Sequence, residues 1–457
     1  MGVRFGTDGI RGVANAELGV ELVLALGRAA ARVLPAQSFV VGRDTRQSGP
    51  LLQSALSAGL ASEGADVVDL GVLPTPGVAW ASADRSVPGA VISASHNPYV
   101  DNGVKLFAAG GQKLPDATEE AIEEELERIV QGEARGPRPP TGPGVGRLWA
   151  DTGVSGAYID HLVSVVEGRD LAGMEVVVDC ANGAAWQVAP DVLQRLGATV
   201  HVVAAEPDGT NINSACGSTH PELVAAEVVA RRAHLGLALD GDADRLVAVD
   251  HTGALATGDE LLALFAIDLA ARGRLAGNSV VVTVMSNLGF RLAMAERGIT
   301  VRETPVGDRY VLEALDSDGL ALGGEQSGHI VFRQLATTGD GTLTALLLLD
   351  LLHRTQRPLA ELTAESMQRL PQVLLNVAVT DPSAAVEDAS VQAELALVSD
   401  ELGSLGRVIL RASGTEPLVR VMVEAQGHEA AQAAAERLRT AVEAAGRHGA
   451  SPGVLAP

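Results

Sequence analysis

A serine, a histidine and an asparagine stand together at Ser95, His96 and Asn97, directly after the apolar run Ala90–Ile92. The apolar run predicts the end of a buried strand, and Asn97 with the proline after it cannot continue a strand or a helix. We therefore expect the Ser95 hydroxyl on a tight loop at a strand end, where α/β proteins place reacting groups. Taken alone, the stretch also fits a polar turn without chemistry.

Three carboxylates lie within five residues at Asp240, Asp242 and Asp244, directly after another apolar run. Their mutual repulsion is relieved most simply by a cation. An EF-hand is excluded, because Arg245 stands where its glycine belongs and His251 where its last glutamate belongs. Three carboxylates with room for a phosphate oxygen suit Mg²⁺. The alternative is a solvated acidic turn.

A second glycine-containing turn, between two predicted strands near the C-terminus, carries the residues of an anion site. Its glycine lets backbone amides point at one anion, two hydroxyls add donors, and two arginines supply charge for a phosphate. A capped hairpin loop without a ligand remains the alternative. The residues are Arg411, Ser413, Gly414, Thr415 and Arg420.

A carboxylate, a hydroxyl and an imidazole follow a further predicted strand at Glu325, Ser327 and His329. This set suits a ligand rich in hydroxyl groups, although a core histidine beside a glycine turn is equally common. Near the N-terminus Arg11 stands among glycines, which is weak evidence by itself.

Lys105 and Lys113 are the only lysines in a chain that otherwise uses arginine for its cations. An amine that can lose its proton, kept where arginine is the rule, indicates a role for Lys105 in proton or phosphoryl transfer. Chance remains an alternative.

Composition limits the classes of protein. The chain has 457 residues, 47% of them apolar and 20% charged, which is typical of a globular protein with several domains. Its formal charge of −23 disfavours nucleic acid and anionic membranes as partners. Two cysteines, Cys180 and Cys216, and an N-terminus without an apolar leader indicate the cytoplasm. The most apolar run, Leu343–Leu352, contains Asp350 and predicts a buried helix rather than a membrane span.

Strands alternate with helices from residue 18 to about residue 300, which predicts largely parallel, doubly wound sheets. From Met367 the order changes to strand, helix, paired strands and a long helix. The Pro- and Gly-rich run at 136–144 is the clearest boundary. We predict three α/β domains and a smaller α+β domain, with limits at 1–150, 151–253, 254–366 and 367–457.

Five stretches in this order resemble the motifs of the α-D-phosphohexomutase family and span nearly the whole chain. Within the family, residues 211–220 and 307–310 and Gln326 resemble the bacterial phosphoglucosamine mutase branch more than the phosphomannomutase/phosphoglucomutase branch, which remains the alternative. The five stretches are Thr7-Asp-Gly-Ile-Arg-Gly12, Ser93-Ala-Ser-His-Asn-Pro98, Asp240-Gly-Asp-Ala-Asp-Arg245, Gly324-Glu-Gln-Ser-Gly-His329 and Arg411-Ala-Ser-Gly-Thr-Glu-Pro417.

The resemblance implies four domains around a central cleft and a phosphoserine mechanism that interconverts the 6- and 1-phosphates of a sugar, here glucosamine, through a bound 1,6-bisphosphate. By this likeness Ser95 carries the phosphoryl group and is itself a ligand of one Mg²⁺, together with the three aspartates. Glu325 and Ser327 bind sugar hydroxyls, and the residues at 411–420 hold the phosphate that does not react. The implied electrostatic and acid-base groups are Arg11, His96, Lys105, Arg245 and His329. A monomer or a homodimer is expected.

Two other classes of protein share single features of this sequence. A Mg²⁺-dependent phosphatase with Asp240 as nucleophile usually has Thr or Val at the fifth position, where Asp244 stands, and gives Ser95 no role. A non-catalytic metal- or anion-binding module explains the acidic turn and little else.

Overall fold

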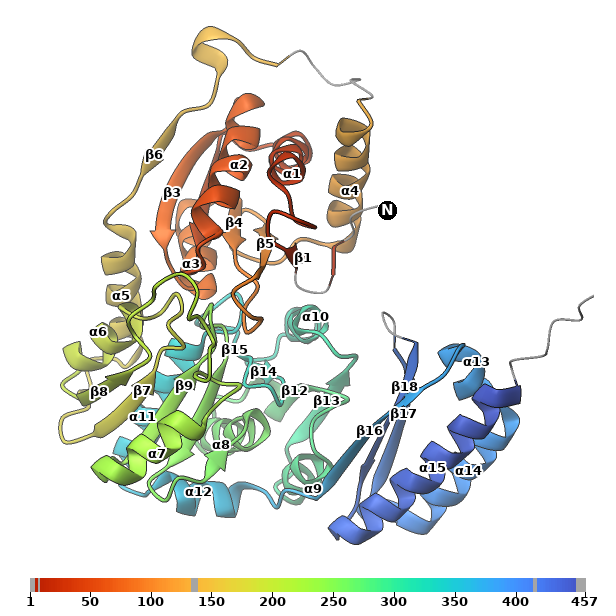
Figure 1. Ribbon diagram of the computed structural model, residues 1–457. Coiled ribbons are helices and arrows are strands. Elements are labelled where there is room, and N and C mark those ends of the chain that lie inside the picture. The colour runs from red at the N-terminus through yellow and green to blue at the C-terminus, as the bar shows by residue number, and fades with distance from the viewer. Residues whose placement is uncertain (1–4, 7–8, 133–138, 414–416, 449–457) are drawn as a thin grey trace, which may run out of the picture. The chain divides into compact units, whose positions relative to one another are not determined.

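The computed structural model describes residues 5–6, 9–132, 139–413 and 417–448 (Figure 1). Contacts divide the chain into two compact units, one of residues 1–285 and 298–366 and the other of residues 286–297 and 367–457. The first unit contains three sheets and the second contains one. Among the described residues, no helix combines the length and apolar character needed to cross a membrane.

The first sheet has the strand order β1-β5-β4-β2-β3-β6. Its centre is parallel, because β2 pairs in parallel with β3 and β4, whereas β5 runs antiparallel to both β4 and β1. The chain after Ser95 therefore turns back into a strand, and Lys105 on β5 lies opposite Val91 on β4. The elements are β1 (Ile10–Val13), α1 (Val20–Val33), β2 (Ser38–Arg43), α2 (Gly49–Ser62), β3 (Asp66–Val72), α3 (Thr75–Arg85), β4 (Gly89–Ile92), β5 (Asp101–Phe107), α4 (Asp116–Val130) and β6 (Leu148–Ala150).

The second sheet has the order β11-β10-β9-β7-β8, with β7 parallel to β8 and β9. The central strand β9 is buried along its whole length, as expected for an apolar strand in a parallel core. Strand β10, which the sequence analysis did not predict, returns antiparallel to β9, so the three aspartates lie in the hairpin between them. The elements are α5 (Val154–Val165), β7 (Glu175–Asp179), α6 (Val188–Arg195), β8 (Thr199–Val203), α7 (Glu222–Arg231), β9 (Leu235–Leu239), β10 (Leu246–Asp250) and β11 (Leu255–Ala256).

The third sheet has the order β13-β12-β14-β15. Strand β12 is a Val-rich buried strand, parallel to β13 and β14, and β15 returns antiparallel to β14. The buried helix predicted over Leu343–Leu352 is confirmed as α11. The elements are α8 (Gly258–Ala271), β12 (Ser279–Thr283), β13 (Thr300–Thr304), α10 (Asp308–Asp318), β14 (Leu322–Gly324), β15 (Ile330–Phe332), α11 (Gly341–Thr355) and α12 (Leu359–Ser366).

The second unit is an antiparallel sheet of order β16-β18-β17 with its helices, and it includes α9 from an earlier part of the chain. The fully buried Glu424 on β18 accepts hydrogen bonds from the side chain of Asn287 at 3.1 Å and from the N–H of Leu288 at 2.9 Å. These bonds fix the start of α9 to the sheet. The elements are α9 (Leu288–Glu296), β16 (Gln372–Ala378), α13 (Pro382–Glu387), α14 (Ala389–Leu402), β17 (Arg407–Ala412), β18 (Leu418–Glu424) and α15 (His428–His448).

The predicted plan of three α/β domains and a smaller α+β domain is confirmed. Two details differ from the sequence analysis. The strand β6 follows the Pro- and Gly-rich run and pairs with β3, so that run connects two parts of one sheet. Helix α9, expected in the third α/β domain, groups with the last sheet because of its bonds to Glu424. The four domain limits stay a prediction.

Candidate active site

Ser95 lies just beyond the end of β4 and is buried, as expected for a group presented by a strand-end loop. Its hydroxyl donates to Oδ2 of Asp240 at 2.6 Å, and its Oγ lies 3.3 Å from Nδ1 of His96. Since Asp240 belongs to the second sheet's hairpin, the structure brings together two loops that are 145 positions apart in the sequence. The serine and the acidic turn therefore form one site.

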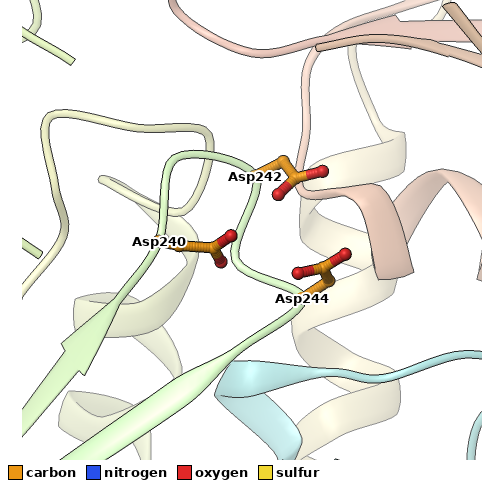
Figure 2. Close-up of side chains that lie close together, drawn as sticks. All are labelled: Asp240, Asp242 and Asp244. Atoms are coloured by element: carbon orange, nitrogen blue, oxygen red, sulfur yellow. The ribbon is translucent and has the colours of Figure 1, made fainter. Parts of the chain in front are cut away.

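The three aspartates stand on the loop that follows β9, and their side chains lie close together (Figure 2). One carboxylate oxygen from each lies within 4.8 Å of the others, and all three residues are buried. Burial, and then the charges of Asp244 and Asp242, raise the pKa of Asp240 well above its usual value. A carboxylate group in this state is stabilised by any cation that enters.

Two carboxylate oxygens of the site, Oδ1 of Asp242 and Oδ1 of Asp244, are buried and have no hydrogen-bond partner among the residues that the structure describes. Buried polar atoms in proteins are nearly always satisfied, so these oxygens indicate a missing ligand. Oxygen-only donors are the ones that Mg²⁺ prefers. The residues present therefore fit a magnesium ion.

Lys105 is the nearest cation to the aspartates. Its Nζ lies 2.8 Å from Oδ2 of Asp242 and 3.5 Å from Oδ2 of Asp244, and its side chain is almost completely buried. Although burial acts in the opposite direction, the charges of Lys105 and His329 hold the pKa of Asp244 well below its usual value. The retained lysine noted in the sequence is thus placed within the acidic cluster.

His96 lies between the serine and two arginines. Burial, followed by the charges of Arg245 and Arg11, lowers the pKa of His96 below its ordinary value. Nη1 of Arg245 lies 3.2 Å from Nδ1 of His96, and the Arg245 N–H donates to Oδ1 of Asp240 at 3.2 Å. The imidazole is therefore neutral at neutral pH, with Arg245 and Arg11 as the positive groups beside it.

The loop between β14 and β15 brings His329 to the same cluster. Nδ1 of His329 lies 3.6 Å from Oδ2 of Asp244, and Nε2 lies 3.7 Å from Oδ2 of Asp308. Burial alone would lower the pKa of His329, but Asp244 and then Asp308 raise it to about 9. The two carboxylates thus favour the protonated ring, while the N–H of Gly339 lies 3.2 Å from Nε2.

Glu325 and Ser327 stand on the same loop as His329. Oε1 of Glu325 accepts the N–H of Gly307 at 3.2 Å. The Ser327 Oγ is buried without a hydrogen-bond partner among the described residues. A hydroxyl in this position is available to a ligand, which agrees with the role expected for this residue.

The loops approach one another backbone to backbone, which explains two of their glycines. A Cβ on Gly241 would lie 2.5 Å from the carbonyl oxygen of Ser95. Gly328 has a φ of +91°, and its Cβ would lie 2.1 Å from the carbonyl oxygen of Leu246. Any side chain at Gly241 would push its loop away from the loop of Ser95, and any side chain at Gly328 would push its loop away from Leu246.

The predicted anion turn belongs to the second unit. Arg411 on β17 and Arg420 on β18 are direct cross-strand partners, and the N–H of Ser413 donates to the carbonyl of Leu418 at 2.9 Å. Like charges directly opposite each other destabilise a sheet unless a negative charge offsets them. Gly414 and Thr415 lie outside the described residues.

The sequence analysis missed several residues that support the site. Thr75 donates to Oδ2 of Asp242 at 2.7 Å, and Lys113 pairs with Asp308 at 2.5 Å. Arg46 and Asn213 contact the serine loop. The signal for Arg46 was present, because it follows the predicted strand that became β2, the parallel neighbour of β4. The position of Asn213 depends on the fold of a separate domain and gave no local signal.

Comparison with known families agrees with this geometry. Profiles of the phosphoglucomutase/phosphomannomutase family match the α/β/α domain I at residues 2–133, domain II at 156–253, domain III at 257–370 and the C-terminal domain at 374–441. Together these matches cover most of the chain. They include every loop described above.

Individual relatives agree as well. A phosphoglucosamine mutase of Desulforudis audaxviator is 52% identical over 431 residues, covering 93% of this chain and 94% of the relative. A phosphoglucosamine mutase of Saccharopolyspora erythraea is 52% identical over 447 residues, covering 96% of this chain and 99% of the relative. A phosphoglucomutase/phosphomannomutase family protein of Burkholderia thailandensis has a crystal structure with a TM-score of 0.80 at 28% identity, covering 96% and 97% of the two chains. The chain therefore belongs to the phosphoglucomutase/phosphomannomutase family, the α-D-phosphohexomutases, as its motifs predicted.

Proposed function

We propose that this protein is a phosphoglucosamine mutase, which interconverts glucosamine 6-phosphate and glucosamine 1-phosphate through a phosphorylated Ser95. The observation that carries the proposal is the buried Ser95 hydroxyl, which lies 2.6 Å from a carboxylate of the acidic loop, with Lys105 and Arg245 close by. The substrate class is inferred from the two phosphoglucosamine mutases that are each 52% identical to this chain.

The reaction consists of two phosphoryl transfers. In the first, the bond between phosphorus and Oγ of Ser95 breaks, a bond forms to the 1-oxygen of the sugar, and the hydroxyl proton is transferred to the serine oxygen through a basic group. In the second, the bond between the 6-phosphorus and the 6-oxygen breaks, a bond forms to Oγ of Ser95, the serine proton is transferred to the 6-oxygen, and glucosamine 1-phosphate leaves. Atoms balance, and no outside phosphoryl donor is needed once Ser95 is phosphorylated.

The residues of the site would act mainly through charge. Phosphoryl transfer needs alignment and neutralisation of the phosphoryl oxygens more than covalent help. Asp240, Asp242 and Asp244 would hold Mg²⁺ beside Ser95. When bound, the ion would neutralise phosphoryl oxygens. Lys105 and Arg245 contact these carboxylates and lie within reach of the same oxygens.

His329, whose protonated form the charges of Asp244 and Asp308 favour, would serve as a proton donor, whereas His96, whose pKa is lowered, would accept a proton. Arg11 would add positive charge beside His96. These roles follow from protonation states, and they assign opposite tasks to the two histidines.

Substrate binding would use two further sets of residues. Glu325 and the unpartnered hydroxyl of Ser327 would bind sugar hydroxyls. The opposed pair Arg411 and Arg420 would hold the phosphate that does not react. The sequence adds Ser413, Gly414 and Thr415 to this phosphate site.

The intermediate must present both of its ends to Ser95, so the sugar is bound in two orientations. Strict recognition of the 2-substituent is then geometrically difficult, and some activity on glucose and mannose phosphates is expected. A phosphomannomutase/phosphoglucomutase with the same mechanism is the alternative assignment.

The test compares kcat/KM for glucosamine 6-phosphate, glucose 6-phosphate and mannose 6-phosphate on one phosphorylated preparation of the enzyme. The highest value is expected for glucosamine 6-phosphate, and a higher value for either neutral sugar would overturn the branch assignment. Acid-stable phosphate on Ser95 is expected, whereas acid-labile phosphate on Asp240 would indicate a phosphatase. Ser95→Ala should fold normally and lose activity by several orders of magnitude.

A further inference from the structure

Ser95 has a backbone conformation that needs support. Its φ is +51°, in the left-handed region that residues other than glycine rarely adopt. Such conformations persist only where the surroundings enforce them, and they concentrate at functional sites. The N–H of Ser95 donates to Oγ of Ser93 at 3.0 Å, and that hydroxyl donates to Oδ2 of Asp44 at 2.6 Å. One side of the Ser95 backbone is thus tied to the loop after β2.

The other side of the Ser95 backbone is held by Arg46, whose side chain is completely buried. Nη2 donates to the carbonyl of Ser95 at 2.9 Å and to that of Asn97 at 2.8 Å. Nη1 donates to the carbonyl of Asp101 at 3.0 Å and to that of Pro98, while Nε pairs with Asp44 at 2.9 Å. The guanidinium is therefore directed almost entirely at the carbonyls of one loop.

Asn213 contacts the same loop from the second α/β domain. Its Nδ2 donates to the carbonyl of Ser95 at 2.9 Å and to the carbonyl of Asn97 at 3.1 Å. These are the two carbonyls that also accept from Nη2 of Arg46. Asn213 belongs to the stretch 211–220, and its own backbone N–H donates to the carbonyl of Ala181 at 2.9 Å.

Burying an arginine is costly unless its charge and all its donors are used. What offsets this cost here is the fixed conformation of a single loop, since the side-chain donors of Arg46 bind Asp44 and the backbone carbonyls of residues 95–101. Phosphoryl transfer depends on the alignment of the reacting oxygen, and a displacement of about 1 Å can cost roughly 10²-fold in rate. The two side chains therefore control the position of the Ser95 oxygen.

We propose that Arg46 and Asn213 are positioning residues that together hold Ser95 in its left-handed conformation and align its Oγ for phosphoryl transfer. This inference rests on the proposed function, in which Ser95 carries the phosphoryl group. Because each side chain binds the same two carbonyls, either one retains the loop in part when the other is removed. Their contributions are consequently coupled across the two domains.

The test uses Arg46→Lys, Asn213→Ala and the double variant of the full chain, phosphorylated beforehand. We expect kcat for glucosamine 6-phosphate to fall about 10²-fold in each single variant, with KM within threefold of wild type. In the double variant the loss should be larger than the product of the single losses, because neither side chain remains to hold the two carbonyls. The first-order transfer of phosphate from Ser95 to added sugar phosphate should slow by the same factor in a single turnover.

Two matched controls separate positioning from general stability. Asn278 resembles Asn213 in two respects. Its side-chain amide donates to a backbone carbonyl, that of Gly298 at 2.7 Å, and its φ is positive, at +47° compared with +58° for Asn213. Asn278→Ala is therefore a matched control for Asn213→Ala. Arg32→Lys alters a guanidinium whose hydrogen bonds go to the carboxylates of Glu63 and Glu125 instead of the carbonyls of the serine loop. Both controls should keep wild-type kcat.

Two results would overturn the inference. One is a rise in KM of the same size with kcat unchanged, and the other is a kcat within threefold of wild type in both single variants. If Arg46→Lys does not fold, the values of kcat and KM for Asn213→Ala alone decide whether the inference holds. An inactive wild-type protein that takes up no phosphate on Ser95 refutes the proposed function instead, so the two failures are distinguishable.

Discussion

Lys105→Met removes the one ammonium that the structure places against the acidic loop, while it preserves most of the length of the side chain. In the folded protein Nζ lies 2.8 Å from Asp242 and 3.5 Å from Asp244. At an effective dielectric constant near 20 these separations correspond to gross attractions of roughly 6 and 5 kcal/mol. Because the lysine must also be desolvated, the net loss is smaller, and breaking a buried ion pair from one side typically costs about 3–5 kcal/mol.

We expect the free energy of unfolding of Lys105→Met to fall by about that amount when divalent cations are removed by chelation. We also expect Mg²⁺ to raise the unfolding midpoint of the variant more than that of the wild type. The reason is electrostatic: three buried carboxylates that lose a positive neighbour gain affinity for another cation. The assay is urea unfolding in EDTA and across a Mg²⁺ titration, which requires no catalytic turnover.

Lys113→Met is the matched control, because it removes the other lysine of the chain from its ion pair with Asp308 at 2.5 Å. The control should also lose stability, but its response to Mg²⁺ should equal that of the wild type. Equal stability of Lys105→Met and wild type in EDTA would refute the reasoning. So would a smaller Mg²⁺ effect in Lys105→Met than in the control.

Three further predictions concern separate parts of the protein. Asp242→Asn keeps the shape of the side chain but removes one ligand charge, so the Mg²⁺ concentration for half-maximal initial rate should rise at least tenfold, and an unchanged value would count against the metal site. Arg411→Ala should raise KM more than it lowers kcat, because a non-reacting phosphate is bound alike in the ground and transition states. The fall in kcat/KM should correspond to about 2–3 kcal/mol of lost binding free energy. A change confined to kcat would assign Arg411 to the chemistry. Glu63→Gln should cost about 1.5 kcal/mol at neutral pH, because hydrogen bonds from Arg32 and Arg28 lower the pKa of Glu63 below its ordinary 4.5 against the opposing effect of burial. A lowered folded pKa gives stability that is present above pH 4.5 and is lost as the pH falls through the folded value, so the wild type and Glu63→Gln should converge in urea unfolding at low pH, and a constant difference would contradict this account.

The parts of the site that the sequence predicted are those defined by local order. Ser95, Asp240 and Glu325 each follow a short apolar strand, and the change from apolar to small polar residues marks the strand end. Strand β5 was not predicted, because its sequence Asp-Asn-Gly-Val-Lys-Leu-Phe begins with turn-forming residues. It is a strand because it pairs with both β1 and β4, and neither pairing can be recognised from its own residues.

The grouping of α9 could not be predicted for a related reason. Its apolar pattern is that of an ordinary helix in an α/β domain, and the decisive partner, Glu424, lies more than 130 positions later in the chain. A glutamate at the end of a mostly apolar strand was the local signal, and its burial could not be known from the sequence. Contacts of long sequence separation determine the unit to which such an element belongs.

Arg46 shows where reading a sequence for chemistry reaches its limit. Arg46 and Arg245 both follow buried strands of α/β sheets, and both stand two or fewer residues from an aspartate. On the criterion of a charged group at a strand end, each is a candidate for binding phosphate. In the structure Arg245 contacts His96 and Asp244 and remains partly exposed, whereas Arg46 is completely buried against backbone carbonyls. The residue type and the strand end are the same, so what distinguishes the two arginines is burial: the Arg46 guanidinium is enclosed by the carbonyls of one loop, whereas the Arg245 side chain is partly exposed. That is a property of the folded chain, and it makes Arg46 a group that controls the reacting serine without reaching the substrate.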